Sequence, residues 1–356
     1  MKVGTAVLAK EDGSPSAARI GALADQVAQL TARGLRVTIV TSGAIGAGVA
    51  RAEMAGRPRD LPGLQAAAAI GQPALMSAYE RALARHGLHA AQILVTRSDF
   101  ENRQRYLNIR NTITALHAVK AVPLINENDT VAVEEIRFGE NDIIAAQVAN
   151  LLRADLLIIL SVVDGLLDGD GRVVDLVPAV SDETLGMVCR SKSGLGTGGM
   201  LTKLQAVRLV TQAGEGAVIA NGRTDGILLR ILGGEKVGTV FAPAPEKLSA
   251  RQRWIGMTVR PHGRVRVDDG AAAVLRRGGK SLLATGVIGV EGDFARGDIV
   301  DVVDAKDRRI ARGKTNYASG ELEKIKGLRT AQIRQVLGAR PFDEVIHCDN
   351  MVLLAE

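Results

Sequence analysis

The sequence is poor in the residues that build disulfide frameworks and metal centres. It contains two cysteines, Cys189 and Cys348, which lie far apart without metal-ligand spacing, and five histidines, which form no cluster. A disulfide scaffold is therefore excluded, and we assign no metal-ligating side chain. We expect free thiols in a reducing environment and place the protein in the cytoplasm.

Long hydrophobic segments are absent as well. No run of about 18 apolar residues occurs, so no transmembrane helix is expected. Met1-Lys2 leads into Gly4-Thr5 without the apolar core of a signal peptide. With 46% hydrophobic and 24% charged residues the composition is globular, and 356 residues exceed one ordinary core, so two domains are expected.

Positive charge gathers in the last third of the chain. Residues 251–356 carry 19 Lys and Arg against 14 Asp and Glu, whereas the first 250 residues carry 26 against 25. Such an excess fits a polyanionic partner, and it fits an ordinary basic surface equally well.

Helical and strand-like segments alternate as far as about Phe241, which predicts an α/β fold with a mainly parallel sheet between layers of helices. Ala242-Pro243-Ala244-Pro245 reads as a linker, and the short strand-like runs beyond it, separated by Gly and Asp turns, predict a small, mostly β barrel. The expected domains are therefore 1–245 and 246–356. We expect strands at 36–41, 91–96, 121–125, 156–160, 216–220, 263–267, 282–290, 299–303 and 309–314, and helices at 16–33, 64–86, 103–119, 142–153, 201–212 and 329–337.

A glycine-rich segment precedes the expected helix at 201–212. Gly196, Gly198 and Gly199 free backbone N–H groups for an anion, and Lys203 can place an ammonium group on the same anion. A flexible loop capped by Thr197 explains the segment equally well, and the spacing is not that of a Walker A motif.

Polar residues follow several of the expected strands, in segments 2–5, 42–44, 126–129 and 141–142. Loops at a shared sheet edge converge, so these segments can line one pocket. Lys2 and Lys203 suit a transferring phosphoryl group, and Asp142 could hold both. Ser42 with the amides of Gly43 and Ala44 could bind a carboxylate, although each residue alone is equally a turn former or a helix cap.

Together these segments resemble the glutamate 5-kinase family, whose members combine the amino acid kinase fold with a C-terminal PUA domain. The resemblance covers essentially the whole chain in order. It is carried by segments 2–5, 40–45, 67–72, 96–111, 125–132, 138–142, 163–166, 194–203, 286–287 and 292–298, among which Asn126-Glu127-Asn128-Asp129 and Gly196-Thr197-Gly198-Gly199-Met200 with Thr202-Lys203 are the most specific.

The resemblance implies ATP-dependent phosphorylation of the γ-carboxylate of L-glutamate to γ-glutamyl 5-phosphate, the first step of proline biosynthesis, with Mg²⁺ bridging the ATP phosphates. It assigns phosphate contacts to Lys2 and Lys203, which Asp142 orients as the third catalytic residue. It places glutamate at Ser42, Asn126, Asp129 and Asn141, beside the amides of Gly43 and Ala44. It places the nucleotide at Lys2, Ser161, Val162, Thr197, Gly198, Gly199, Met200, Leu201, Thr202 and Lys203.

Three departures from the family pattern stand out. The family has a strand before the lysine-bearing turn, so Met1 is either a mis-called start or follows a truncated strand. Glu140 and Val162 stand where the family usually has aspartate. These two changes are expected to weaken ATP or metal binding without abolishing catalysis.

The family also implies feedback inhibition by proline, a homo-oligomer, and functional coupling to the reductase that consumes γ-glutamyl phosphate. RNA binding by the PUA domain is possible but not expected. Two alternatives stay open: a kinase of the same fold acting on N-acetylglutamate, aspartate, carbamate or a nucleotide, and an RNA-binding or regulatory protein descended from a kinase.

Overall fold

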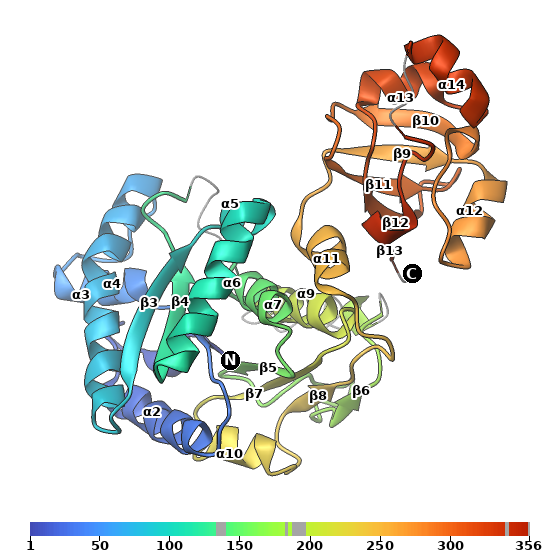
Figure 1. The fold of residues 1–356 in the computed structure, drawn as a ribbon. Helices are drawn as coiled ribbons and strands as arrows, with labels where there is room; N and C mark the ends of the chain where they lie inside the picture. The colour runs from blue at the N-terminus through green and yellow to red at the C-terminus, as the bar shows by residue number, and fades with distance from the viewer. Residues whose placement is uncertain (133–139, 182–183, 187–196, 339–341, 355–356) are drawn as a thin grey trace. The chain divides into compact units, whose positions relative to one another are not determined.

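The computed structural model describes residues 1–132, 140–181, 184–186, 197–338 and 342–354. They form two compact units, Met1–Glu246 and Lys247–Glu356 (Figure 1). Cys189, the Phe138–Gly139 part of the 138–142 segment and the Gly194–Gly196 part of the glycine-rich segment lie outside the described residues. In the described part of the chain every helix is too short or too polar to span a bilayer.

An eight-stranded sheet forms the middle layer of the first unit, in the order β3-β4-β2-β1-β5-β7-β8-β6. Only β7 and β8 pair antiparallel among these described strands, so the predicted mainly parallel sheet is confirmed. The strands are β1 Lys2–Val3, β2 Ile39–Val40, β3 His89–Val95, β4 Ala121–Glu127, β5 Leu156–Ser161, β6 Leu176–Val177, β7 Gly216–Asn221 and β8 Thr239–Phe241.

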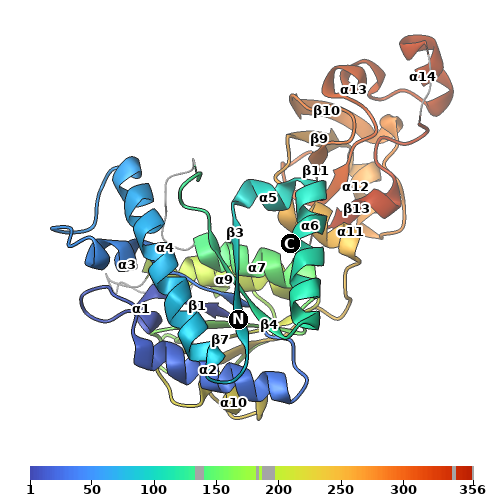
Figure 2. The same ribbon diagram turned by 60° about the vertical axis from the view of Figure 1, so that its left-hand side comes forward.

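Helices cover both faces of this sheet (Figures 1 and 2). Three of them, α6 Arg103–Ala118, α7 Glu140–Leu152 and α9 Thr197–Thr211, lie on one face, and α7 and α9 pack side by side. The opposite face carries α2 Ala17–Ala32, α4 Leu61–Ala84 and α10 Ile227–Leu232, which share a buried apolar core with the strands. The short helices are α1 Thr5–Leu8, α3 Ala44–Arg51 and α5 Arg97–Glu101.

Local sequence signals fix several of these helix ends. Ser16 caps α2 by accepting the N–H of Arg19 at 3.4 Å, and Gly34 follows the helix with a φ of +84°. The strand expected at 36–41 is shorter than predicted, since only Ile39 and Val40 pair with neighbouring strands. Its expected beginning is exposed, and β1, its neighbour, is itself only two residues long.

The second unit contains a five-stranded sheet in the order β10-β9-β11-β12-β13, with short helices around it. Three predicted strands have the predicted bounds, whereas the strand expected at 282–290 begins only at Val287, because residues 284–286 form a 3-10 turn. The helix expected at 329–337 is present as α14. The strands are β9 Gly263–Val267, β10 Val287–Gly292, β11 Ile299–Val303, β12 Arg309–Lys314 and β13 Met351–Leu353, and the helices are α11 Ala250–Arg253, α12 Asp269–Arg276, α13 Ser319–Ile325 and α14 Thr330–Leu337.

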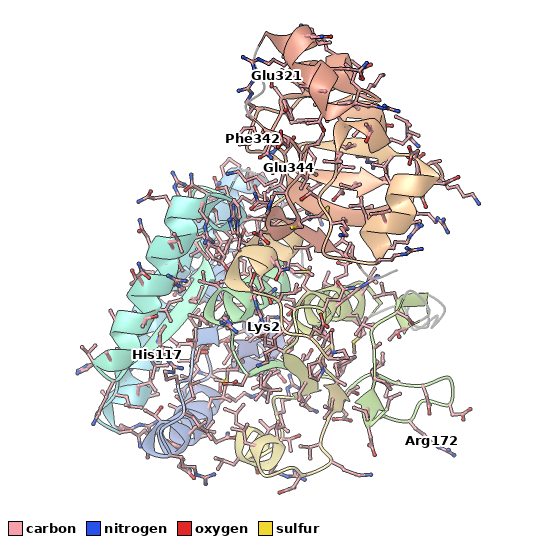
Figure 3. All side chains as sticks on the ribbon, turned by 45° about the vertical axis from the view of Figure 1, so that its right-hand side comes forward. Lys2, His117, Arg172, Glu321, Phe342 and Glu344 are labelled. Carbon is pink, nitrogen blue, oxygen red and sulfur yellow. The ribbon has the colours of Figure 1, made fainter. Side chains whose placement is uncertain are left out.

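Partly buried polar contacts connect the segment after α14 to the residues that follow β12. The hydroxyl of Tyr317 donates to the carbonyl of Phe342, and the amide of Asn316 donates to the carbonyl of Glu344. Figure 3 labels the two accepting residues, Phe342 and Glu344. Tyr317 is fully buried, so its hydroxyl needs this partner.

Candidate active site

Lys2 reaches the site from the short strand at the centre of the first sheet. Because side chains alternate across a strand, Val3 enters the core beneath α2 and α4, while Lys2 emerges on the face that carries α7. The Nζ atom of Lys2 lies 2.7 Å from Oδ1 of Asp142, in the first turn of α7, and the Asp142 side chain is 1% exposed. Figure 3 shows Lys2 in the interior of this unit.

Lys203 approaches the same carboxylate from α9. Its Nζ lies 3.3 Å from Oδ2 of Asp142, and it donates at 3.0 Å to the carbonyl of Gly199, one helical turn earlier. The hydroxyl of Thr202 also points toward Asp142, at 3.4 Å from Oδ2.

The start of α9 differs from the prediction. The helix begins at Thr197 and not at Leu201, so Gly198, Gly199 and Met200 belong to its first turn and Lys203 to its second. The first four N–H groups of a helix have no intrahelical partner. The beginning of α9 can therefore supply the free backbone donors that were expected from a separate glycine loop.

Lys2, Lys203 and Asp142 together bring a net positive charge into the interior of the protein. Burial lowers the pKa of Lys2, the negative charge of Asp142 raises it, and the positive charge of Lys203 lowers it again. Two ammonium groups share one carboxylate, and an anion placed between them would relieve their repulsion. This donor set fits a phosphoryl group.

The segment after β2 adds a second group of polar atoms. Ser42 is buried, and its hydroxyl donates to the carbonyl of Val3 at 2.7 Å. This hydrogen bond holds the end of β1 in place. Gly43 has a φ of +105° and precedes α3 without a side-chain cap. The N–H groups that open α3, beginning at Ala44, are thus not covered by a capping side chain.

Two amide side chains meet beside the lysines. Asn126 belongs to β4 and is 2% exposed, and its Oδ1 accepts a hydrogen bond from Nδ2 of Asn141 at 3.3 Å. Asn141 directly precedes Asp142 in α7, so this contact ties the end of β4 to the lysine-binding carboxylate. Asp129, two residues beyond β4, is also buried.

The positions expected to bind the nucleotide follow β5. Ser161 ends this strand, and the register of β5 against β1 places it just beyond the level of Val3, at the same sheet edge as Ser42. Val162 is 42% exposed. An apolar side chain therefore meets solvent at the position where the resemblance leads us to expect aspartate.

Gln72 of α4 ends the 67–72 segment that carries part of the family resemblance, but no role was predicted for it. Its Oε1 accepts from Nδ2 of Asn126 at 2.8 Å, and its Nε2 donates to Oε1 of Gln92 in β3 at 3.0 Å. Beside that resemblance, the local signal was a polar residue on the buried side of an alanine-rich helix.

A cavity of about 490 Å³ lies at the other end of the same unit, near the starts of β3 and β4. Its lining includes Arg36, His86, His117 and Lys120, and no residue predicted for the site. Figure 3 shows His117 at the end of α6. Burial and the charge of Arg36 lower the pKa of His117.

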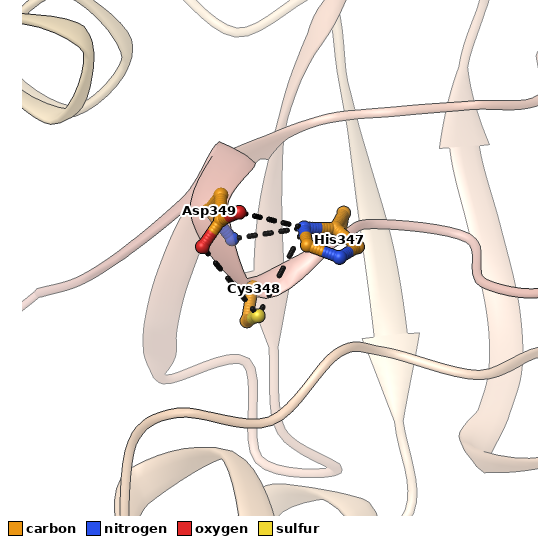
Figure 4. Close-up of side chains that lie close together, drawn as sticks. All are labelled: His347, Cys348 and Asp349. Atoms are coloured by element: carbon orange, nitrogen blue, oxygen red, sulfur yellow. Dashed lines mark hydrogen bonds and ion pairs between the residues drawn. The ribbon is translucent and has the colours of Figure 1, made fainter.

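In the second unit, His347, Cys348 and Asp349 bring a ring nitrogen, a thiol and a carboxylate together (Figure 4). The Sγ atom of Cys348 lies 3.9 Å from Nδ1 of His347 and 3.8 Å from Oδ1 of Asp349. Mg²⁺ prefers oxygen ligands, so this group is not suited to the magnesium expected with ATP.

Comparison with known proteins now decides the family. A model of the amino acid kinase family matches residues 1–221. The chain belongs to the amino acid kinase family. A PUA domain model matches residues 263–337, which include β9 to β12 of the second unit.

Curated relatives match this amino acid kinase over nearly its full length. A relative named glutamate 5-kinase from Caldanaerobacter subterraneus is 46% identical over 99% of this chain and 97% of its own length. Relatives of the same name from Geobacter sulfurreducens and Methylococcus capsulatus are 44% and 46% identical, each over 99% of this chain and 96% of their own. The resemblance expected from the motifs is confirmed.

Proposed function

We propose that this chain transfers the γ-phosphoryl group of ATP to the γ-carboxylate of L-glutamate, as the first step of proline biosynthesis. The observation that carries the proposal is the buried contact of Lys2 and Lys203 with the single carboxylate of Asp142. It lies beside the polar residues at the strand ends, and the curated relatives, which match nearly the whole chain, are named for this activity.

The reaction places simple demands on these residues. A γ-carboxylate is already ionised at neutral pH, so its oxygen can attack the γ-phosphorus of ATP without a general base. One P–O bond forms to glutamate as the bond to the leaving ADP oxygen breaks. The enzyme must align the two reactants and neutralise charge on the transferring group.

Lys2 and Lys203 would neutralise that charge in our proposal. Asp142 would hold the two ammonium groups close together and aimed at one point, since without its negative charge they would repel each other. Asp142 thus acts on the lysines rather than as a base.

Glutamate would lie along the polar strand ends. The uncovered amides of Gly43 and Ala44 at the start of α3 suit its α-carboxylate. Asp129 and Asn141 offer oxygen atoms of the kind that bind an ammonium group.

ATP would lie over Ser161, Val162 and the start of α9, from Thr197 to Lys203. Mg²⁺ would arrive with the ATP phosphates and neutralise part of their charge. The described lysines fit such a phosphate-bound ion, because they supply positive charge to the phosphates and leave the metal's oxygen ligands to ATP and water.

Three further properties belong to this proposal because they accompany the family. We expect a homo-oligomer, inhibition by proline, and functional coupling to the reductase that consumes γ-glutamyl phosphate. We also expect the enzyme to work in the cytoplasm, where its product is used.

Trapping the acyl phosphate tests the function. The full chain is incubated with ATP, Mg²⁺ and hydroxylamine, and with glutamate, aspartate, N-acetylglutamate or carbamate in parallel. We expect hydroxamate from glutamate alone, and its loss in the Lys203→Met variant, with circular dichroism confirming that the variant is folded. Product from another acceptor, or from none while the wild-type chain is folded, would contradict the proposal.

A further inference from the structure

A chain of four amide side chains runs from the edge of the sheet to the candidate glutamate site. Gln92 lies on β3, Gln72 on α4, Asn126 on β4 and Asn141 on α7. Gln72 donates to Gln92 at 3.0 Å, Asn126 donates to Gln72 at 2.8 Å, and Asn141 donates to Asn126 at 3.3 Å. Gln92 is exposed, whereas Gln72 and Asn126 are buried.

All three bonds in this chain point in the same direction. An amide has a donor end and an acceptor end, so turning any one amide of the chain over would bring two donors or two acceptors together. The orientations of the four side chains are therefore linked. They can reverse only together, and Gln72 is the buried link between the exposed end and Asn126.

The free end of the chain is an unused acceptor. Because Nδ2 of Asn141 is directed at Asn126, its Oδ1 points away from that partner. This oxygen is buried, and among the described residues it has no hydrogen-bond partner. A buried carbonyl oxygen without a donor is unfavourable, so this oxygen can accept a hydrogen bond from an N–H group that a ligand brings.

We propose that Gln72 is a positioning residue for substrate selection. It fixes the amide direction so that Asn141 presents oxygen, and not nitrogen, to the α-ammonium group of the substrate. This inference rests on the proposed function and deepens it, since it names the group by which the kinase distinguishes an amino acid from the same dicarboxylate without its amine. With the amides reversed, Asn141 would present a donor and would repel an ammonium group.

The close packing of α3 and α4 holds Gln72 in place. A Cβ atom added to Gly71 would lie 1.8 Å from the carbonyl oxygen of Ala44, and one added to Gly48 would lie 1.7 Å from that of Ala67. The two helices therefore approach backbone to backbone at glycine. Gln72 follows Gly71, so its position is fixed relative to the start of α3.

Two substitutions of Gln72 separate its hydrogen bonding from its bulk. Gln72→Met keeps the length of the side chain but removes both hydrogen bonds, which frees Asn126 and Asn141 to turn over. Gln72→Glu keeps an acceptor for Asn126, and its protonated form can also donate to Gln92. We therefore expect Gln72→Glu to preserve the amide direction.

Gln26 provides the matched control. It is a buried glutamine of α2 that donates to the carbonyl of Ala22 and accepts from the N–H of Leu228. Gln26→Met removes the same number of side-chain bonds from a buried helix position that no substrate is proposed to touch.

The experiment compares glutamate with glutarate, which lacks only the amine. Calorimetric binding of both ligands and hydroxamate kinetics are measured for the wild type and all three variants. Loss of one oriented hydrogen bond to a charged group predicts an increase of roughly tenfold or more in the Kd and KM for glutamate in Gln72→Met. We expect kcat and the KM for ATP to change less than about twofold, glutarate binding to change little, and Gln72→Glu to recover most of the preference.

The outcomes separate this inference from the proposed function. The wild-type chain could bind glutamate better than glutarate without phosphorylating it. That result would contradict the kinase proposal, and the binding comparison would still test this inference. An unchanged glutamate-to-glutarate ratio in folded Gln72→Met would overturn the inference. So would Gln72→Glu behaving like Gln72→Met, or Gln26→Met changing the ratio as much. Absence of glutamate binding to the wild type would overturn both proposals.

Discussion

Asp142→Asn removes one charge from the centre of the site and leaves its shape almost unchanged. Lys2 and Lys203, 2.7 and 3.3 Å from this carboxylate, would then face a neutral amide. Their side chains are only 8% and 12% exposed, so water can screen their repulsion only in part. Removing one partner of a buried ion pair typically costs about 3–5 kcal/mol, and we expect a loss of unfolding free energy near the lower end of that range.

The same change should reduce catalysis. If the misaligned lysines stabilise the transition state by about 3 kcal/mol less, kcat falls roughly a hundredfold. The pH profile gives a second signature. Asp142 raises the pKa of Lys2 against the lowering by burial, so without the carboxylate this pKa falls further. Activity that needs the Lys2 ammonium group is lost as the pH rises through this pKa, and the alkaline limb should move to lower pH.

Urea unfolding and hydroxamate kinetics between pH 6 and 10 would measure both effects. Sulfate serves as the control, because an anion between the lysines should restore more stability to Asp142→Asn than to the wild type. A variant that keeps kcat within about threefold of wild type, with an unmoved alkaline limb, would refute the role assigned to Asp142.

Three other substitutions probe separate parts of the molecule. Gly71→Ala places a Cβ 1.8 Å from a backbone oxygen of α3, so we expect a loss of several kcal/mol in urea unfolding, and a loss below 1 kcal/mol would contradict the packing. Val162→Asp should lower the KM for ATP several-fold if the exposed valine weakens the nucleotide site, whereas an unchanged or higher KM would count against this reason. Burial tends to raise the pKa of Asp304, but the N–H of Arg308 and the guanidinium of Arg276 hold it well below its usual range. Its contribution to stability is present above about pH 4 and is lost as the pH falls, so Asp304→Asn should flatten the acid side of the thermal stability curve, and an equally steep curve would exclude this role.

The sequence predicted the site best where charged or polar side chains stand beside turn-forming residues. Lys2, Asp142 and Lys203 could be proposed together because each stands in a polar segment beside an apolar strand or helix. Their contact depends on long-range packing, since β1, α7 and α9 are far apart in the chain. The 2.7 and 3.3 Å distances could therefore not be read from residue spacing.

Other features left no local signal. Nothing in the alanine-rich sequence around Gln72 indicates that its amide meets Asn126, because that meeting is set by how α4 lies on the sheet. The start of α9 at Thr197 was missed because two glycines favour a loop, and tertiary packing against α7 overrides that weak preference. The helix α12 is not among the predicted helices, although the sequence held a usable signal for it. Asp268 caps the helix by accepting the N–H of Ala271.

Following an oxygen atom through one turnover tests the central claim most directly. Glutamate labelled with ¹⁸O in its γ-carboxylate is incubated with ATP, Mg²⁺ and hydroxylamine, and the released phosphate is examined by ³¹P NMR. If the γ-carboxylate attacks phosphorus, hydroxylamine attack at the acyl carbon leaves one ¹⁸O in each phosphate formed. Phosphate free of ¹⁸O would mean that ATP is hydrolysed by water, and would contradict phosphoryl transfer to glutamate.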